Sequence, residues 1–274
     1  AGVVANCLDA AEFRAVVPVR PGNTDKRKAG APLILAGSEQ FPGAAVMCAR
    51  GAARAGAGYV TVAVPERAAS ALRTHLIEQT IVTYDPTDVE GSVETIVDVA
   101  QRYGSLAIGP GLAAAAQMGT IMREVIRRLD LPMVIDASGL FHLAKHLDVV
   151  HRKRVVITPH AGEFARLSGK GTVQEGHRIA RLRAFVQEHD VITLLKGRAT
   201  LIDDGLALHV NPTGTSALAT AGTGDVLTGM IATLLSQGVA PVDAARAAAY
   251  WHAIAGQYAA RERPIGVVAG DVIE

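Results

Sequence analysis

The chain has 274 residues, which suits one α/β domain or two small ones, and 49% of these residues are hydrophobic while only 4% are aromatic. The net charge of +1 excludes broad attraction to nucleic acid or to an anionic membrane, so any anion site must be local. Two cysteines, Cys7 and Cys48, favour free thiols in a reducing compartment, and no apolar run reaches the length of a membrane span or a signal peptide. We therefore expect a cytoplasmic protein.

Apolar runs and helical patterns alternate along the chain. We predict buried strands at residues 32–36, 59–64, 77–83, 105–109, 132–136, 154–158 and 191–195, and a hairpin of 199–203 with 206–210 across Asp204-Gly205. Predicted helices occupy residues 44–55, 66–75, 92–103, 114–129, 173–189, 226–235 and 241–261, and another starts after His160. This alternation predicts an α/β fold, with a central, mostly parallel sheet and helices on both faces, and residues 1–274 as a single domain.

Glycine and polar residues follow several of these strands, at the sheet edge where open α/β folds bind ligands. Gly109-Pro-Gly111 ends one strand, either as a simple turn or as a close backbone approach to a ligand. Asp136 ends another and either points into the cleft or caps the next helix. His160 and Glu163 begin a helix, as a capping box or as a ligand contact with a carboxylate near a metal-bound phosphate.

The stretch from Asn211 to Asp225 is rich in Gly, Thr and Pro and leads directly into an apolar helical pattern. Free amides at the start of that helix, with Gly222 and Gly224 allowing close approach, predict an anion site. Asp225, at or near the N-cap, is either a cap or a general base beside a phosphate. Lys196, at the end of a buried strand, suits a nucleotide phosphate or ribose. Neither GxxxxGK[ST] nor GxGxxG occurs in the chain.

Taken in order, these motifs resemble a known family. Asn211-Pro-Thr-Gly214 followed by Ala221-Gly-Thr-Gly-Asp225 resembles the anion-hole and catalytic-aspartate signature of the ribokinase-like superfamily. Thr158-Pro-His-Ala-Gly-Glu163 is similar to its TPNxxE element, with His in place of Asn. Over residues 26–274 the chain resembles one branch in particular, the ADP- or ATP-dependent NAD(P)H-hydrate dehydratases. The further motifs that carry this resemblance are Ala36-Gly-Ser38, Pro42-Gly-Ala-Ala45, Gly109-Pro-Gly-Leu112 and Leu195-Lys-Gly197.

This resemblance implies a ribokinase-like fold and a hydro-lyase that repairs NADH and NADPH hydrated on the nicotinamide ring, as the S-epimer. Asp225 would take the proton from the ring hydroxyl, which attacks the terminal phosphate of ADP or ATP. The amides of residues 222–224 would hold the developing charge, and Mg²⁺ would bridge the phosphates. The ring nitrogen would then expel phosphate, with AMP or ADP as the other product.

The resemblance also implies roles for individual residues. The implied contacts to the hydrated cofactor are Ala44, Gly111, His160 and Asp225. The implied nucleotide contacts are Lys196, Gly197, Arg198, Ala199, Thr200, Gly222, Thr223 and Gly224. Glu163 matches the carboxylate that acts on Mg²⁺ through water. We further expect a functional pairing with an NAD(P)H-hydrate epimerase and a homo-oligomer, with no nucleic acid or membrane partner.

The sequence departs from the family pattern around the anion loop and the central strand. Thr215-Ser-Ala217 stands where Asn-Pro-Gly is usual, Ala221 replaces the first Gly, and Ser138 replaces the second Asp of Asp-Ala-Asp. Two alternatives stay open at this point. One is a kinase of the same superfamily for a vitamin alcohol such as a thiazole, and the other is an inactive nucleotide-binding subunit, which the departures suggest.

Overall fold

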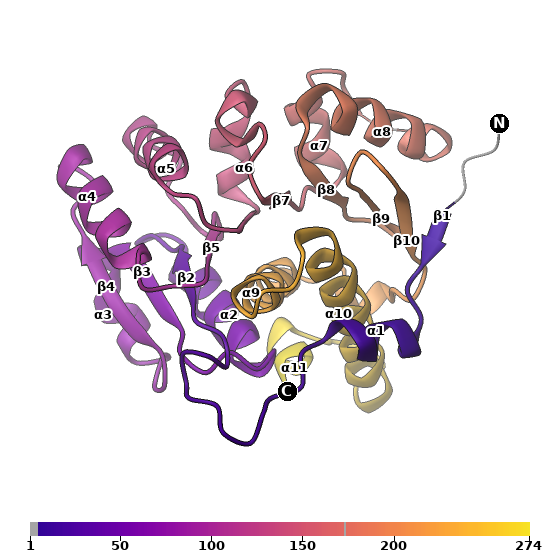
Figure 1. The fold of residues 1–274 in the computed structure, drawn as a ribbon, viewed down its shortest axis with the longest axis horizontal. Helices are drawn as coiled ribbons and strands as arrows, with labels where there is room; N and C mark the ends of the chain where they lie inside the picture. The colour runs from indigo at the N-terminus through magenta and orange to yellow at the C-terminus, as the bar shows by residue number, and fades with distance from the viewer. Residues whose placement is uncertain (1–4, 173) are drawn as a thin grey trace.

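A single sheet organises the molecule. The computed structural model describes residues 5–172 and 174–274, and within these ranges ten strands form the sheet (Figure 1). Their order across it is β1-β10-β9-β8-β7-β6-β5-β2-β3-β4. Neighbouring strands are parallel except for β9, which runs antiparallel to both β8 and β10. The bounds are β1 (Ala5–Cys7), β2 (Pro32–Leu35), β3 (Thr61–Pro65), β4 (Thr80–Tyr84), β5 (Ser105–Ile108), β6 (Met133–Ile135), β7 (Val155–Ile157), β8 (Ile192–Leu195), β9 (Thr200–Asp203) and β10 (Leu208–Asn211).

Helices cover both faces of the sheet (Figure 1). One layer contains α1 (Ala10–Val16), α2 (Pro42–Arg54), α3 (Glu66–Arg73), α9 (Thr223–Ser236), α10 (Pro241–Glu262) and α11 (Ala269–Ile273). The other contains α4 (Val89–Ala100), α5 (Ala116–Arg128), α6 (Ser138–Leu143), α7 (Ala161–Ser168) and α8 (Arg178–His189). Short 3₁₀ helices lie at Leu147–Val150, Glu175–His177 and Ser216–Leu218. Within the described residues, no helix combines the length and the apolar character that crossing a bilayer requires.

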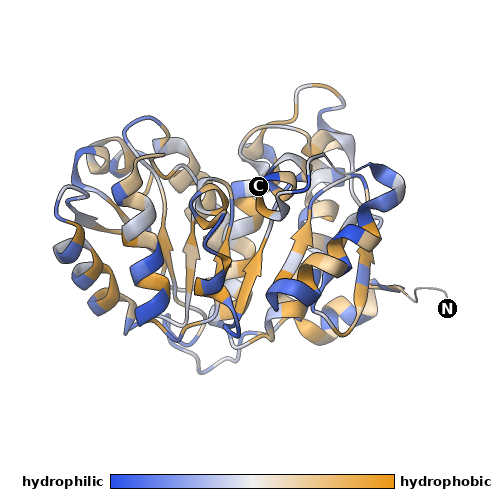
Figure 2. Ribbon diagram, turned by 90° about the horizontal axis from the view of Figure 1, so that it is seen from above, coloured by the Kyte–Doolittle hydropathy of each residue, from blue (hydrophilic) through white to orange (hydrophobic). Residues whose placement is uncertain are grey.

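The core has two halves because successive side chains of a strand point to opposite faces. Ile34 of β2 faces the layer of α2, α9 and α10, whereas its neighbours Leu33 and Leu35 face the layer of α4 to α8. Figure 2 shows hydrophobic colour on the strands and on the helix faces that meet them, with hydrophilic colour on the outer surfaces. Strands that are buried on both faces are continuous apolar runs, which explains why the sequence pattern located them.

The largest departures from the predicted elements lie at the N-terminus and before α8. The predicted helix over 173–189 begins at Arg178, because Glu175–His177 forms a 3₁₀ turn that contains Gly176; residue 173 lies outside the described residues. Neither β1 nor α1 was predicted from the sequence. A capping box between Asp9 and Glu12 starts α1, so the signal for that helix was present.

Candidate active site

An ion pair joins two strand ends at the carboxyl edge of the sheet. Asp136 follows β6 and is 1% exposed, and Lys196 follows β8. The Lys196 ammonium donates to Asp136 Oδ1 at 2.7 Å, and the Thr228 hydroxyl, from α9, donates to Oδ2 at 2.8 Å. The N-cap position of α6 is Ala137, which makes no side-chain cap, and the Asp136 carboxylate points toward Lys196 and Thr228. The interpretation of Asp136 as a helix cap was wrong.

The anion loop is held against α10 by polar contacts. Asn211 donates through Nδ2 to the Ala249 carbonyl at 2.8 Å, and its Oδ1 accepts from the amide and the hydroxyl of Thr213. Gln257, also on α10, donates to the Thr213 carbonyl at 2.6 Å. The Thr223 hydroxyl donates back to the Leu218 and Thr220 carbonyls at 2.8 and 2.9 Å. These contacts fix the loop before the helix begins.

Of the departures from the family pattern, Thr215 to Ala217 and Ala221 lie in the same loop, whereas Ser138 begins α6. Thr215 caps the 3₁₀ turn Ser216–Leu218, and its hydroxyl accepts from the Ala217 amide at 3.3 Å. Leu218 then packs on Gly256 of α10, where a β-carbon would meet it at 2.6 Å. The loop is thus ordered by a threonine cap at the position where the family usually has Asn-Pro-Gly.

Asp225 lies in the first turn of α9. Gly222 occupies the N-cap position with φ of +92°, so Asp225 is the third helical residue and sits beside the free amides of the first turn. Burial raises its pKa to about 7, the negative charges of Asp136 and Glu163 act in the same direction, and the Lys196 ammonium opposes them. A carboxyl group with a pKa near neutrality, next to an anion site, is able to accept a proton during a reaction.

His160 and Glu163 form the capping box that the sequence allowed. His160 Nδ1 accepts from the amides of Gly162 and Glu163 at 3.0 and 3.3 Å, and Glu163 Oε2 accepts from the His160 amide at 2.8 Å. The His160 side chain is 60% exposed, so a ligand can reach it. Glu163 Oε2 also lies 4.0 Å from the Lys196 ammonium, which places Glu163 at the same sheet edge as Asp136 and Lys196.

Ala44 and Gly111, the two implied substrate contacts with small side chains, lie together. A β-carbon built on Gly111 would meet the Ala44 β-carbon at 2.8 Å and the Phe41 carbonyl oxygen at 2.6 Å, and its φ of +66° favours glycine. Gly109 has even less space around it, since a β-carbon there would lie 1.8 Å from the Asp136 carbonyl oxygen. The Gly109-Pro-Gly111 segment is therefore a close backbone approach between neighbouring strand ends. Phe41, 56% exposed, was not singled out from the sequence.

A buried arginine, which was not predicted from the sequence as part of the site, supports the turn after Lys196. Arg178 is 7% exposed and donates to the Leu195 and Lys196 carbonyls, both at 3.4 Å. Gly197 makes room for it, because a β-carbon there would lie 2.4 Å from the guanidinium. The predicted nucleotide segment runs from Lys196 through Arg198 and Ala199 to Thr200. It comes close to the anion loop at Gly214, because a β-carbon built on Gly214 would lie 3.3 Å from the Arg198 carbonyl oxygen.

The donor set of this edge fits a water-rich magnesium site. Among residues 5–172 and 174–274, no three His, Cys, Asp or Glu side chains are placed to hold a metal alone. Mg²⁺ is usually bound by one or two carboxylates, several waters and substrate phosphates, which requires no such cluster. Glu163 has a half-buried carboxylate beside the anion loop and matches this mode of binding through water.

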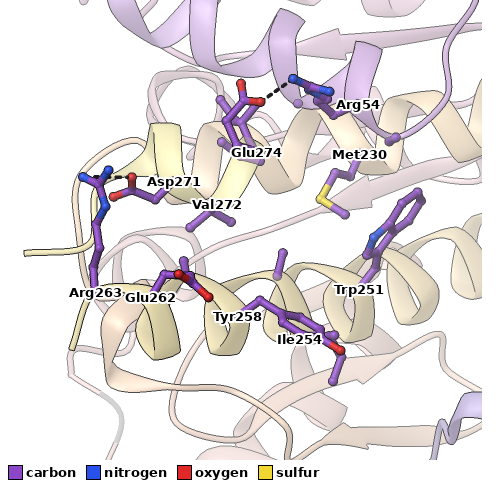
Figure 3. A pocket seen from close by; sticks show the side chains of 16 residues that line it. Arg54, Met230, Trp251, Ile254, Tyr258, Glu262, Arg263, Asp271, Val272 and Glu274 are labelled. Carbon is purple, nitrogen blue, oxygen red and sulfur yellow. Dashed lines mark hydrogen bonds and ion pairs between the residues drawn. The ribbon is translucent and has the colours of Figure 1, made fainter. Parts of the chain in front are cut away.

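A hollow of about 810 Å³ lies elsewhere, between α2, α9, α10 and α11 (Figure 3). Met230, Trp251 and Tyr258 line it, and at its rim Arg54 pairs with Glu274 and Arg263 with Asp271. None of the described residues that line it is a predicted site residue. The hollow is therefore separate from the sheet edge where the predicted site residues lie.

Comparison with known proteins gives relatives for the whole described fold. A sequence model of the NAD(P)H-hydrate dehydratase family matches residues 32–274. The bifunctional NAD(P)H-hydrate repair enzyme Nnr of Salinibacter ruber is 36% identical over 100% of this chain and 52% of its own length. The chain spans about half the length of the curated relatives it matches.

Solved structures agree with these relatives. The ADP/ATP-dependent NAD(P)H-hydrate dehydratase of Bacillus subtilis, co-crystallised with ATP and Mg²⁺, is 30% identical with a TM-score of 0.85, covering 98% of this chain and 95% of its own. A ribokinase-like superfamily protein of Enterococcus faecalis is 25% identical with a TM-score of 0.86, covering 98% and 93%. The predicted ribokinase-like α/β fold is confirmed.

Proposed function

Because the chain belongs to the NAD(P)H-hydrate dehydratase family, we propose that it restores NADH and NADPH from their hydrated forms, using ADP or ATP. The name of the Bacillus subtilis relative supports the reaction, and its co-crystallisation with ATP and Mg²⁺ supports the co-substrate. The observation that carries the proposal is the place of Asp225, whose pKa burial raises to about 7, in the first turn of a helix that Gly222 caps. A proton acceptor and an anion site are thereby adjacent.

In the proposed mechanism, the Asp225 carboxylate accepts the proton of the ring hydroxyl as the hydroxyl oxygen attacks the terminal phosphorus. The bond between that phosphorus and the bridging oxygen of the nucleotide breaks, and AMP or ADP leaves. The electron pair of the ring nitrogen then expels phosphate by breaking the carbon–oxygen bond, and loss of a ring proton restores the dihydronicotinamide. Phosphorylation replaces hydroxide, a poor leaving group, with phosphate.

The chain's own residues position the reactants. The amides of Gly222 and Gly224 at the start of α9 neutralise the charge that develops on the transferred phosphoryl group, whereas the Thr223 amide donates to the Thr220 carbonyl at 3.4 Å. Residues 196–200 approach the anion loop and hold the nucleotide, with the Lys196 ammonium beside its phosphates. Ala44, Gly111 and His160 bind the hydrated dinucleotide. Glu163 would hold Mg²⁺ through water, and the ion would supply positive charge to the nucleotide phosphates.

The test is to follow recovery of the reduced-nicotinamide absorbance from hydrated NADH with ADP, and in parallel with ATP. We expect nucleotide-dependent recovery with release of inorganic phosphate in equal amount. A stable phosphorylated product would instead assign a kinase that acts on an alcohol. Nucleotide binding without any turnover would assign an inactive binding subunit. Either outcome would overturn the proposal.

We also propose that the chain acts together with an NAD(P)H-hydrate epimerase, which would supply the S-epimer. The bifunctional character in the names of the longer relatives supports this pairing. A homo-oligomer, a cytoplasmic location and the extent of a single domain over residues 1–274 stay predictions from the sequence. Size-exclusion chromatography coupled to light scattering measures the first of these.

A further inference from the structure

Asp136 is the buried charge of the site that the mechanism above leaves without a role. It is 1% exposed, and its two carboxylate oxygens each accept one hydrogen bond, from Lys196 at 2.7 Å and from Thr228 at 2.8 Å. These partners come from β8 and α9, so one carboxylate connects the nucleotide turn to the helix that carries Asp225. Burying a carboxylate is costly unless it is paired and hydrogen-bonded, and both conditions are met here.

The contacts lie directly behind the anion loop. A β-carbon built on Gly224 would lie 3.4 Å from the Lys196 ammonium and 3.6 Å from Asp136 Oδ2. The Thr228 hydroxyl also lies 3.0 Å from the Gly224 carbonyl oxygen. The two distances from that β-carbon are ordinary van der Waals contacts, so the ion pair packs directly against the turn at Gly224 and supports it.

Lys196 has two other carboxylates within its electrostatic reach. Glu163 Oε2 lies 4.0 Å from the ammonium, and the negative charge of Asp225 also acts on it. A lysine side chain has four rotatable bonds, so its ammonium can settle on whichever carboxylate attracts it most. If it settled on Asp225, it would hold that carboxylate ionised, reduce its basicity and be drawn away from the nucleotide.

We propose that Asp136 is a positioning residue that acts through Lys196. Its buried carboxylate fixes the ammonium behind Gly224, so that Lys196 meets an incoming nucleotide phosphate and does not pair with Asp225. Thr228 orients the carboxylate by occupying its second oxygen. This inference rests on the proposed function for its catalytic consequence, but its effect on nucleotide binding is independent of the dehydration reaction.

The experiment measures ADP affinity by calorimetry in the presence of Mg²⁺, and turnover with hydrated NADH, for a double-mutant cycle. The variants are Asp136→Asn, Lys196→Met and the two combined. We expect Asp136→Asn to weaken ADP binding about tenfold and to lower kcat by about 10–100-fold, as displaced catalytic groups commonly do. In the Lys196→Met background the same substitution should change ADP affinity less than twofold, because the residue through which it acts is absent.

A matched pair on α9 separates positioning from general packing. Thr228→Val and Thr233→Val remove the same hydroxyl from two fully buried threonines of one helix, but Thr233 donates to the Ala52 and Gly229 carbonyls and lies outside the site. We expect Thr228→Val to weaken ADP binding about threefold more than Thr233→Val. This pair also decides the proposal if Asp136→Asn does not fold.

Two results would overturn the inference. One is an equal effect of Asp136→Asn in the presence and absence of Lys196, since a purely structural role would add independently. The other is equal ADP affinity in the two threonine variants. If no variant turns over hydrated NADH, while the ADP affinities show the expected coupling, the proposed function fails and the role of Asp136 stands.

Discussion

Replacing Asp225 with asparagine should remove activity and stabilise the protein. Burial, assisted by the charges of Asp136 and Glu163, raises the pKa of Asp225 to about 7 in the folded chain, from 3.8 in the reference state. Because the folded pKa is the higher one, the folded state binds more protons between pH 4 and 7, and stability falls as the pH rises through that window. Above pH 7 the loss is complete, and a neutral asparagine avoids it.

The magnitude follows from the shift. At about 1.4 kcal/mol for each pH unit, a pKa of about 7 in place of 3.8 sets an upper bound of about 4 kcal/mol for the destabilisation by the ionised carboxylate. Asp225 is half-buried, and solvent screening reduces the expected gain of Asp225→Asn at pH 8 to roughly 2 kcal/mol. For a chain of this size that is a rise in Tm of roughly 4–8 °C. At pH 4 the two proteins should melt within a degree or two of each other.

The same substitution should lower kcat by at least about a hundredfold, since it removes a general base and leaves the amides of the anion site. Differential scanning fluorimetry from pH 4 to 8 and absorbance recovery from hydrated NADH give the two readouts. Asp243→Asn is the matched control, because Asp243 holds the same third position in α10 and forms an ion pair with Arg246 at 3.0 Å. It should not raise Tm and should leave kcat near the wild-type value.

Two outcomes would refute this reasoning. If Asp225→Asn melts no higher than the wild type at pH 8, the carboxylate is not destabilised by its surroundings. If kcat is unchanged, Asp225 is not the base. In the wild type, the acid limb of kcat/KM against pH should have its midpoint near pH 7, with about a tenth of full activity at pH 6. A midpoint near pH 4 would contradict the assigned environment.

Three further predictions use the same structure. Gly111→Ala should raise KM for hydrated NADH at least about tenfold, because the methyl group would meet Phe41 and Ala44 at a positive φ; Gly43→Ala, with open space around it, is the kinetic control. Burial lowers the pKa of His252 to about 4, so stability should fall as the pH drops from 6.5 towards 4, and His252→Gln should flatten this decline in a thermal melt. Removing Mg²⁺ with a chelator should abolish turnover with ATP, and added Mg²⁺ should restore it; full activity without the ion would exclude its role.

The strands were predictable because their physical signal is local. Each strand buried on both faces is a short apolar run, such as Leu33 to Leu35, that ends in a glycine or a polar residue. The same endings located the carboxyl edge of the sheet, and with it Asp136 and Lys196. The anion loop was equally local, since its glycines precede an apolar helix. The observed element boundaries differ from the predicted ones by a few residues, and Asp225 is the third residue of its helix.

The partners within the site were not predictable, because they depend on how distant segments meet. Asp136 and Lys196 are separated by 60 residues in the chain, and nothing in either local sequence indicates the other. Arg178 begins a polar helix, where an arginine usually lies in solvent; only the fold shows that it fills the space beside Gly197. The sequence left the roles of His160 and Glu163 open, and the structure shows their capping box without excluding a ligand.

The composition of the chain is connected to the chemistry of Asp225 through the packing of α2 on α9. A β-carbon on Gly51 of α2 would lie 2.9 Å from the Val226 α-carbon, and one on Gly229 of α9 would lie 2.0 Å from the Cys48 carbonyl oxygen. Larger side chains at these glycines would separate the two helices. Their close contact excludes water on the α2 side of Asp225, where the thiol of Cys48 is fully buried. Burial raises the pKa of that thiol, and the neighbouring Asp225 charge raises it further. Glycine- and alanine-rich helices thus allow the close packing that desolvates the carboxylate, and desolvation is the main cause of its pKa near 7. A bulkier interface would hydrate Asp225 and return it to an ordinary, weakly basic carboxylate.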